Sequence, residues 1–375
     1  MPFPEKLNTL LTNRIRLGTY RQLKTVNGLV DFCSNDYLGF SKSAGMEKTS
    51  AALLSSEGTG STGSRLISGN TVYAEELEKK IAQYHNSPAA LLFNSGYTAN
   101  LGLLSSAPQK NDLILFDELS HASIFDGIRL SFAKHYKFRH NDVSHLKELI
   151  ARHESGVENI YIVVESVYSM DGDRAPLREL GALLSDKRFL IVDEAHATGV
   201  FGNKGKGCCE EEEIETKCFA RVVTFGKALG AHGAAILGSE ALRNYLINFS
   251  RSFIYTTALP YENLKNIDAA YQLLSATDQQ AHLHNKIKLF RNLCSGAVNL
   301  LPSHSPIQCF LIEGNAEVEK KSVLAQDSGF DIRPIKSPTV AEGEERIRIC
   351  IHSFNSDEEI KKLVETLINC NIMKF

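Results

Sequence analysis

The sequence lacks the features of three large classes of protein. None of its apolar runs approaches the ~18 residues that a membrane-spanning helix needs, so we do not expect a membrane protein. Residues 1–6 are not a basic stretch followed by an apolar one, so we expect no secretory signal and a cytoplasmic location. The 41 basic residues do not outnumber the 44 acidic ones, which leaves no basic excess for binding nucleic acid.

Several short motifs that would signal a function are also missing. The eight cysteines include no C-x-x-C pair, so we expect reduced thiols, no zinc site and no other metal. No serine stands in G-x-S-x-G, which excludes the nucleophile elbow of many hydrolases. Residues 58–63 match G-x-G-x-x-G, but residues 51–54 before them look helical where a dinucleotide site needs a strand. We therefore expect no nicotinamide cofactor.

What is present is an alternation of helix-like and strand-like segments from about residue 70. Residues 71–85 have the apolar spacing of an amphipathic helix, with Thr71 as its cap. Six short runs rich in Val, Ile, Leu or Phe follow, at 89–93, 113–116, 161–164, 189–192, 221–225 and 234–237. Apolar runs separated by helices predict an α/β fold with a mostly parallel sheet and helices on both of its faces.

A second and smaller α/β pattern follows the first. Helical stretches at 240–249 and from about 261 to 300 interrupt the alternation, and strand-like runs return at 307–312 and 346–351. At ~150 residues per domain, a chain of this length holds two or three domains. We expect an N-terminal segment at 1–40, a large domain at 41–265 and a smaller C-terminal domain at 266–375.

Four of the predicted strands or loops end in residues that carry chemistry. Asp193 ends a buried strand, where ligands bind in open α/β sheets, although an acid there can also cap a helix. Lys227 follows another strand and could form a Schiff base with a carbonyl, whereas most lysines are only solvated. Residues 94–100 run from strand through glycine to helix, which suits a phosphate, although an ordinary helix N-cap has the same pattern. His121 follows a further strand and could stack on a planar ring, whereas most loop histidines only make local hydrogen bonds.

These four signals match the needs of one cofactor, pyridoxal 5′-phosphate. It requires a lysine for its aldehyde, a carboxylate for its ring nitrogen, a helix N-terminus for its phosphate and a flat partner for its ring. With the carboxylate in place the ring becomes an electron sink, and a carbanion at the Cα of an amino acid becomes accessible.

The sequence resembles the α-oxoamine synthases, which belong to the class-II aminotransferase superfamily of pyridoxal-phosphate enzymes. The resemblance runs from about residue 5 to the end, and it is carried by SNDYLG at 34–39, GSTGSR at 60–65, SHAS at 120–123, SMDGD at 169–173, DEAH at 193–196 and TFGK at 224–227. It implies fold type I, a homodimer and the condensation of an amino acid with an acyl thioester.

Weaker motifs favour one branch of this family: HNDV at 140–143, GAA at 233–235, IYTTALP at 254–260 and SPIQ at 305–308. The substrates of that branch would be L-alanine and pimeloyl-CoA or a pimeloyl acyl-carrier protein, and the products an oxoamine, CO2 and free thiol. Glycine C-acetyltransferase, 5-aminolevulinate synthase and serine palmitoyltransferase remain alternatives, because one methyl group on the amino acid is worth only ~1–3 kcal/mol in a pocket. A regulator that binds the cofactor but has no catalytic activity is an alternative from another functional class.

The resemblance also implies roles for individual residues. The cofactor would be held by Gly96, Tyr97, His121, Ser169, Asp193, His196, Thr224 and Lys227. Of these, Lys227 would bind the aldehyde and shuttle the proton, Asp193 would meet the ring nitrogen, and His121 would stack on the ring.

The substrates would meet a second set of residues: Arg21, Asn35, His121, Thr339 and Arg348. Arg21 and Thr339 match positions for the acyl donor, and Arg348 would clamp the carboxylate of the amino acid. Arg346 lies on the same face of its predicted strand and is the alternative clamp. Lys336 stands where many relatives carry arginine, and lysine cannot make the arginine fork.

Overall fold

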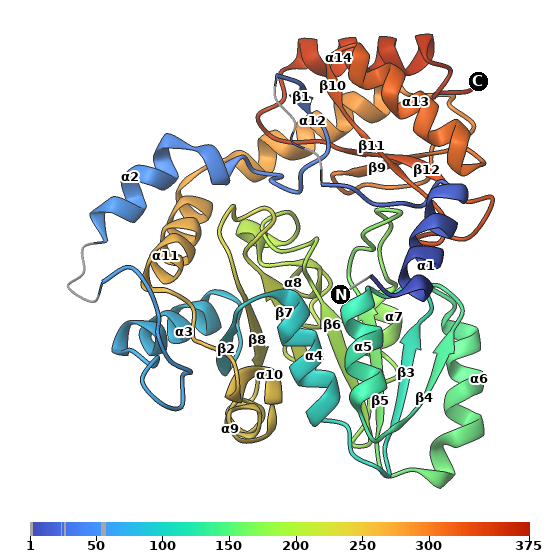
Figure 1. The fold of residues 1–375 in the computed structure, drawn as a ribbon. Coiled ribbons are helices and arrows are strands. Elements are labelled where there is room, and N and C mark those ends of the chain that lie inside the picture. Colours follow the sequence, from blue (N-terminus) through green and yellow to red (C-terminus); the bar gives the residue numbers. More distant parts are fainter. Residues whose placement is uncertain (1–2, 24, 26–27, 54–57) are drawn as a thin grey trace. The chain divides into compact units, whose positions relative to one another are not determined.

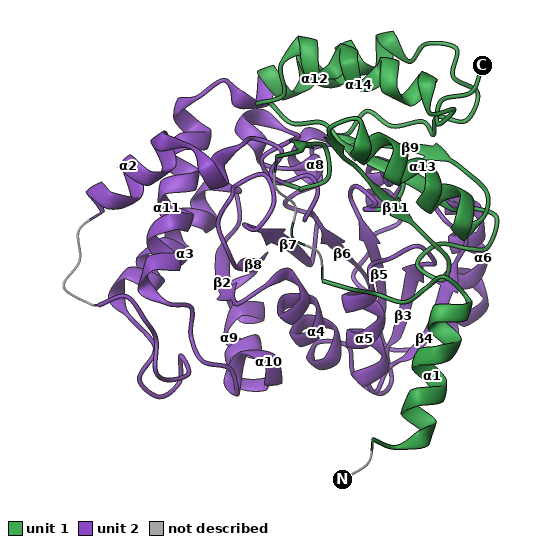
Figure 2. Cartoon of the chain, turned by 45° about the horizontal axis from the view of Figure 1, so that its top comes forward, with its two compact units in different colours: residues 1–35, 170–173, 282–375 green, residues 36–169, 174–281 purple. Residues whose placement is uncertain are grey.

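The fold is shown in Figure 1 as a computed structural model that describes residues 3–23, 25, 28–53 and 58–375. The chain divides into two compact units (Figure 2). Unit 1 consists of residues 1–35, 170–173 and 282–375, and unit 2 consists of residues 36–169 and 174–281. The domain boundaries that we expect from the sequence stay a prediction.

Unit 2 is built on a seven-stranded sheet with the order β2-β8-β7-β6-β5-β3-β4. Its strands are β2 (Ala89–Phe93), β3 (Leu113–Asp117), β4 (Lys134–Phe138), β5 (Ile160–Glu165), β6 (Arg188–Asp193), β7 (Ala220–Thr224) and β8 (Ala234–Gly238). Only β8 runs antiparallel to its neighbours, β2 and β7. The predicted mostly parallel α/β fold is therefore confirmed.

The six apolar runs predicted from the sequence coincide with six of these strands. These strands are apolar because they lie inside the sheet. Every residue of β2, β3, β5 and β7 is buried. The seventh strand, β4, was not predicted: it has the sequence KHYKF, and only its last residue is buried. An edge strand facing water carries polar residues, so it gives no apolar run.

The helices of unit 2 begin and end at local signals. They are α2 (Ala44–Ala52), α3 (Val72–Tyr84), α4 (Gly96–Ser106), α5 (Ala122–Leu130), α6 (Val143–His153), α7 (Leu177–Gly181), α8 (Cys208–Glu211), α9 (Glu240–Phe249), α10 (Arg251–Ile254) and α11 (Tyr261–Ala276). Thr71 caps α3, as predicted, by accepting the N–H of Ala74. Figure 1 shows α4 and α5 side by side, and α4 also packs against β7 and β8.

The helical stretch predicted from about 261 to 300 is two helices. Thr277 has an extended backbone and ends α11, and α12 (Gln279–Leu293) begins two residues later. Thr277 and Asp278 are poor helix formers that favour caps, which explains the break.

Unit 1 has two small sheets and its own helices. The elements are α1 (Glu5–Arg16), β1 (Val30–Asp31), β9 (Ile307–Leu311), α13 (Asn315–Asp327), β10 (Phe330–Asp331), β11 (Arg333–Ile335), β12 (Arg346–Cys350) and α14 (Asp357–Asn369). Strand β12 is the centre of the antiparallel sheet β11-β12-β9, and β1 pairs with β10 in parallel. Across the described parts of both units, we find no helix with the length and apolar character that crossing a membrane requires.

Candidate active site

Three strands of unit 2 end in polar side chains that lie on one face of the sheet. In the register, Glu165 of β5 pairs with Asp193 of β6, and Asp193 pairs with Val222 of β7. Thr224 lies two residues beyond Val222, so its side chain points to the same face as those of Asp193 and Glu165. The carboxyl ends of these parallel strands therefore gather the polar groups that the sequence places there one by one.

A chain of hydrogen bonds connects Asp193 to His121. The Nδ2 group of Asn100 on α4 donates to Asp193 Oδ2 at 2.6 Å and to Ser123 Oγ at 3.0 Å. Ser123 Oγ lies 2.8 Å from His121 Nδ1. The second oxygen of Asp193 accepts the N–H of Ala195 at 2.8 Å. These contacts fix the orientation of the Asp193 carboxylate and of the imidazole ring.

His121 presents a neutral imidazole to this site. Burial lowers its pKa, the charge of Lys227 lowers it further, and the charge of Asp193 opposes both. The N–H of Ser123 donates to His121 Nδ1 at 3.2 Å, which places the proton of the neutral ring on Nε2. Tyr97 meets the same ring edge-on at 6.4 Å between centroids. A neutral imidazole offers a flat face to a planar partner.

Glu165 is a functional candidate that the sequence reasoning missed. Its side chain is 3% exposed, and one of its oxygens accepts the N–H of His121 at 2.5 Å. Burial raises the pKa of this carboxyl well above its usual range, Asp193 raises it further, and Lys227 opposes them. Burial and the neighbouring Asp193 thus both favour the protonated form of Glu165. The available signal was its place directly after a predicted apolar strand.

The N-terminus of α4 is prepared for an anion. Ser95 and Thr98 form a capping box that orients the first turn. Among the described residues, the N–H groups of Gly96 and Tyr97 have no hydrogen-bond partner. A Cβ atom added to Gly96 would lie 2.6 Å from Cγ2 of Thr224, so only glycine lets the two segments approach this closely. Free N–H groups at a helix N-terminus bind phosphates.

His196, Ser169 and Lys227 complete the predicted cofactor set. His196 is buried, and its Nδ1 lies 2.8 Å from the hydroxyl of Tyr37, a second residue without a predicted role. Ser169 and Lys227 are half-buried. Lys227 lies near enough to influence the pKa values of both His121 and Glu165. All eight predicted cofactor residues belong to unit 2.

The residues of this site fit pyridoxal phosphate. Asp193 is 5% exposed, and it makes no ion pair with any residue that the structure describes. A buried carboxylate held only by neutral donors is costly without a cation, and a protonated ring nitrogen would supply one. The open first turn of α4 suits the phosphate, His121 suits the face of the ring, and Lys227 suits the aldehyde.

Glu194, the residue directly after β6, is another buried residue without a predicted role. Its N–H donates to Val222 O at 2.8 Å, and its Oε1 accepts the N–H of Cys209 at 2.7 Å. A Cβ atom on Gly207 would lie 1.8 Å from Glu194 Oε2. This packing fixes the strand end that presents Asp193.

Four predicted substrate residues lie in unit 1. Arg348 Nη2 donates to Asn35 Oδ1 at 2.9 Å, and its Nη1 donates to Cys350 Sγ at 3.0 Å. Arg346 is instead 5% exposed and forms ion pairs with Asp171 and Glu344. The charge of Arg346 is thus already compensated within unit 1.

The other two, Arg21 and Thr339, line one cavity of about 630 Å³. Lys336 lines the same cavity and forms an ion pair with Glu319 at 2.7 Å. The fifth predicted substrate residue, His121, belongs to the unit 2 network.

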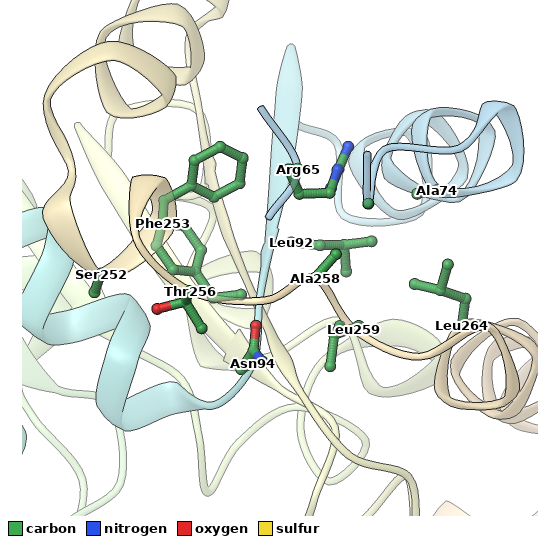
Figure 3. Close-up of a pocket in the computed structure, with 12 residues that line it drawn as sticks. Arg65, Ala74, Leu92, Asn94, Ser252, Phe253, Thr256, Ala258, Leu259 and Leu264 are labelled. Carbon is green, nitrogen blue, oxygen red and sulfur yellow. The ribbon is translucent and has the colours of Figure 1, made fainter. Parts of the chain in front are cut away.

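A separate cavity in unit 2 is too small for the cofactor (Figure 3). Its volume of about 20 Å³ is that of a single water molecule, and Arg65, Asn94 and Phe253 are among its walls. Arg65 forms an ion pair with one oxygen of Glu78 at 2.8 Å, and Arg243 forms an ion pair with the other oxygen at 2.9 Å. This buried ion cluster joins α3 to α9 near the strand β2.

Comparison with known proteins places the chain in a family. The family model for aminotransferase class I and II matches residues 27–367. A protein of Emericella nidulans named 8-amino-7-oxononanoate synthase is 43% identical over 365 residues, which cover 90% of this chain and 88% of that protein. A protein of the same name from Alkalilimnicola ehrlichii is 35% identical over 367 residues, covering 93% of each chain.

Solved structures give the same answer for the fold. The 8-amino-7-oxononanoate synthase of Francisella tularensis aligns with a TM-score of 0.79 and 30% identity, covering 91% of this chain and 97% of that one. The serine palmitoyltransferase of Sphingomonas wittichii aligns with a TM-score of 0.90 and 25% identity over all of both chains. Because the family match spans most of the sequence, the chain belongs to the aminotransferase class I and II family, where its relatives include proteins named 8-amino-7-oxononanoate synthase.

Proposed function

We propose that this protein is an 8-amino-7-oxononanoate synthase. It condenses L-alanine with a pimeloyl thioester and releases 8-amino-7-oxononanoate, CO2 and the free thiol, a reaction of biotin biosynthesis. The observation that carries this proposal is 43% identity, over 90% of the chain, with a protein of that name. The higher TM-score of serine palmitoyltransferase reflects the backbone that the whole family shares, and it does not favour that substrate class.

Pyridoxal phosphate is the cofactor, and it supplies an electron sink that makes proton loss from the Cα of alanine accessible. Lys227 removes this proton and later returns one. Asp193 keeps a proton on the ring nitrogen, with its carboxylate oriented by Asn100. His121 packs its neutral ring against the cofactor and is held there by Ser123. The first turn of α4 binds the phosphate.

The remaining roles follow the same logic. Ser169 and His196 hydrogen-bond near the phenolic oxygen of the cofactor, with His196 oriented by Tyr37. Arg348 binds the carboxylate of alanine beside Asn35. We further propose a homodimer in the cytoplasm, with coenzyme A or an acyl-carrier protein as the thioester carrier.

The substrate assignment is tested by a crossed assay of thiol release. Alanine, glycine and serine are each combined with pimeloyl, acetyl, succinyl and palmitoyl thioesters. We expect alanine with the pimeloyl thioester to give the highest kcat/KM of all pairs, since differential binding in the transition state sets this ratio. If glycine with acetyl-CoA or serine with palmitoyl-CoA is faster, the protein is another α-oxoamine synthase.

Replacement of Arg348 by alanine is expected to weaken the binding of alanine specifically. Losing one partner of a desolvated charge pair costs about 2–5 kcal/mol, which raises the KM for alanine by one to several orders of magnitude. The KM for the thioester should change little. Arg346→Ala is the matched control on the same strand, and its ion pairs with Asp171 and Glu344 predict a loss of stability instead. A normal KM for alanine in Arg348→Ala, together with a large rise in Arg346→Ala, would move the role to Arg346.

A further inference from the structure

One cavity lies entirely within unit 1, between the end of α1 and the segment that begins with β11. It has a volume of about 630 Å³. The chain turns back sharply after α1, because Gly18 has a positive φ of 64° and Thr19 donates its N–H to Arg14 O at 2.9 Å. This turn brings Arg14, from the last turn of α1, and Arg21, from the following segment, to the same cavity.

The walls of this cavity carry an excess of positive charge. Its basic side chains are Arg14, Arg21, Arg333 and Lys336, and Glu319 is its acidic one. Two of the cations are compensated: Arg333 pairs with Asp331 at 2.6 Å, and Lys336 pairs with Glu319 at 2.7 Å.

Arg14 and Arg21 differ from these two. Within the described parts of the chain, no carboxylate lies within salt-bridge distance of either guanidinium. Lys336 also donates to Gly18 O at 3.0 Å, so it fixes the turn that separates the two arginines. The fold thus holds two uncompensated guanidinium groups at one cavity.

We infer that Arg14 and Arg21 form a phosphate-binding pair for the carrier of the acyl donor. This inference rests on the proposed function, which requires an acyl thioester. The resemblance to the family gives an acyl-donor role to Arg21 and Thr339, and it gives none to Arg14. Guanidinium groups bind phosphate oxygens in a two-pronged fashion, and two of them match the charge of a phosphate better than that of one carboxylate.

Exposure also favours a phosphate over the acyl chain. Both arginines are exposed, and a phosphate bound there keeps part of its hydration and avoids the cost of full burial. Coenzyme A and the phosphopantetheine arm of an acyl-carrier protein share a phosphate on the pantetheine unit. Both carriers therefore present the chemistry that the pair recognises.

The test measures the binding of free coenzyme A to the cofactor-loaded protein by calorimetry. We expect Arg14→Gln and Arg21→Gln each to weaken this binding about 10-fold or more, since a hydrogen bond to a charged group is lost. Arg16→Gln is the matched control, because Arg16 is exposed in the same turn of α1 and does not line the cavity. It should bind coenzyme A like the wild type.

Phosphate-free and partly phosphorylated probes identify the group that is recognised. The KM for pimeloyl-pantetheine, which has no phosphate, should be the same in Arg14→Gln and the wild type. Weakened binding of 4′-phosphopantetheine in Arg14→Gln would assign the pair to the phosphate that both carriers share. Weakening seen only with coenzyme A would assign it to the nucleotide phosphates.

Two results would overturn the inference. One is equal affinity for coenzyme A in Arg14→Gln and Arg16→Gln. The other is an equal rise in KM for pimeloyl-CoA and pimeloyl-pantetheine, which would assign Arg14 to the terminal carboxylate of the acyl chain. Failure of the proposed function looks different: the wild type would not convert alanine and pimeloyl-CoA, whereas the calorimetric comparison of Arg14→Gln with Arg16→Gln would still give its answer.

Discussion

Replacement of Lys227 by alanine is expected to leave less than about one thousandth of the wild-type kcat, because the group that moves the Cα proton is removed. Lys227 lies three residues after the end of β7, and no other lysine lies within three residues after the end of a unit 2 strand in the described structure. The loss should appear in kcat for thiol release. Cofactor binding should persist, since the contacts expected from Asp193 and from the first turn of α4 do not involve Lys227.

The assignment of Lys227 has a direct chemical check. Treatment of the wild-type protein with borohydride should fix the cofactor to the lysine that holds it, and peptide mapping should find the pyridoxyl mass on the peptide that contains residues 224–227. Lys217→Ala is a suitable control, because Lys217 is an exposed lysine of the same unit and should be dispensable. A label on Lys204, Lys206 or Lys336 would refute the site, and full activity in a colourless, cofactor-free protein would refute the family's chemistry for this chain.

The sequence predicts the core of the fold well because buried strands need apolar residues. Strands such as β2 and β5, which are buried along their whole length, consist almost only of apolar residues and are visible as runs. Strand β4 pairs with only one neighbour and faces water. Most of its residues are therefore exposed, and its sequence contains no apolar run. The sequence analysis also missed the break at Thr277. The helices α11 and α12 on either side of it both have helical spacing of apolar residues, so together they look like one long helix.

For the candidate site, the local sequence predicts the role of a residue only when that role does not depend on a partner far away in the chain. Asp193 and Lys227 stand at strand ends, where their chemistry can be inferred from the local sequence. Asn100 has no such signal: it becomes a partner of Asp193 only because the fold joins positions 93 residues apart. Ser123 and Tyr37 lie inside motifs that carry the family resemblance, but the sequence gives neither a role; the fold gives them one, because they orient His121 and His196.

Glu165 and Asp193 illustrate a further limit of sequence reasoning. Both are acidic residues at the ends of neighbouring buried strands, and composition alone treats them alike. The structure separates them, because burial and the charge of Asp193 raise the pKa of Glu165. Neighbouring acids of the same type can therefore differ in their preferred protonation state, and only the fold shows which of them is favoured as the neutral form.

Replacement of Asp193 by asparagine is expected to lower kcat about 10²–10³-fold, with a weaker hold on the cofactor. The substitution removes the negative charge that keeps the ring nitrogen protonated, and breaking a buried charge pair costs about 3–5 kcal/mol. It also disturbs the local hydrogen bonds. Both oxygens of Asp193 accept N–H groups, from Asn100 and from Ala195, and an asparagine has only one oxygen to offer.

The matched variant Asn100→Ala separates charge from orientation. It keeps the Asp193 carboxylate and removes only the 2.6 Å hydrogen bond that aims it, so we expect a loss of about 10-fold in kcat. Cofactor dissociation constants and melting temperatures measured on both variants exclude unfolding as the cause. If Asp193→Asn binds the cofactor and turns over like the wild type, then the buried carboxylate at the end of β6 does not serve the ring nitrogen. A loss in Asn100→Ala as large as that in Asp193→Asn would instead mean that the aim of the carboxylate matters as much as its charge.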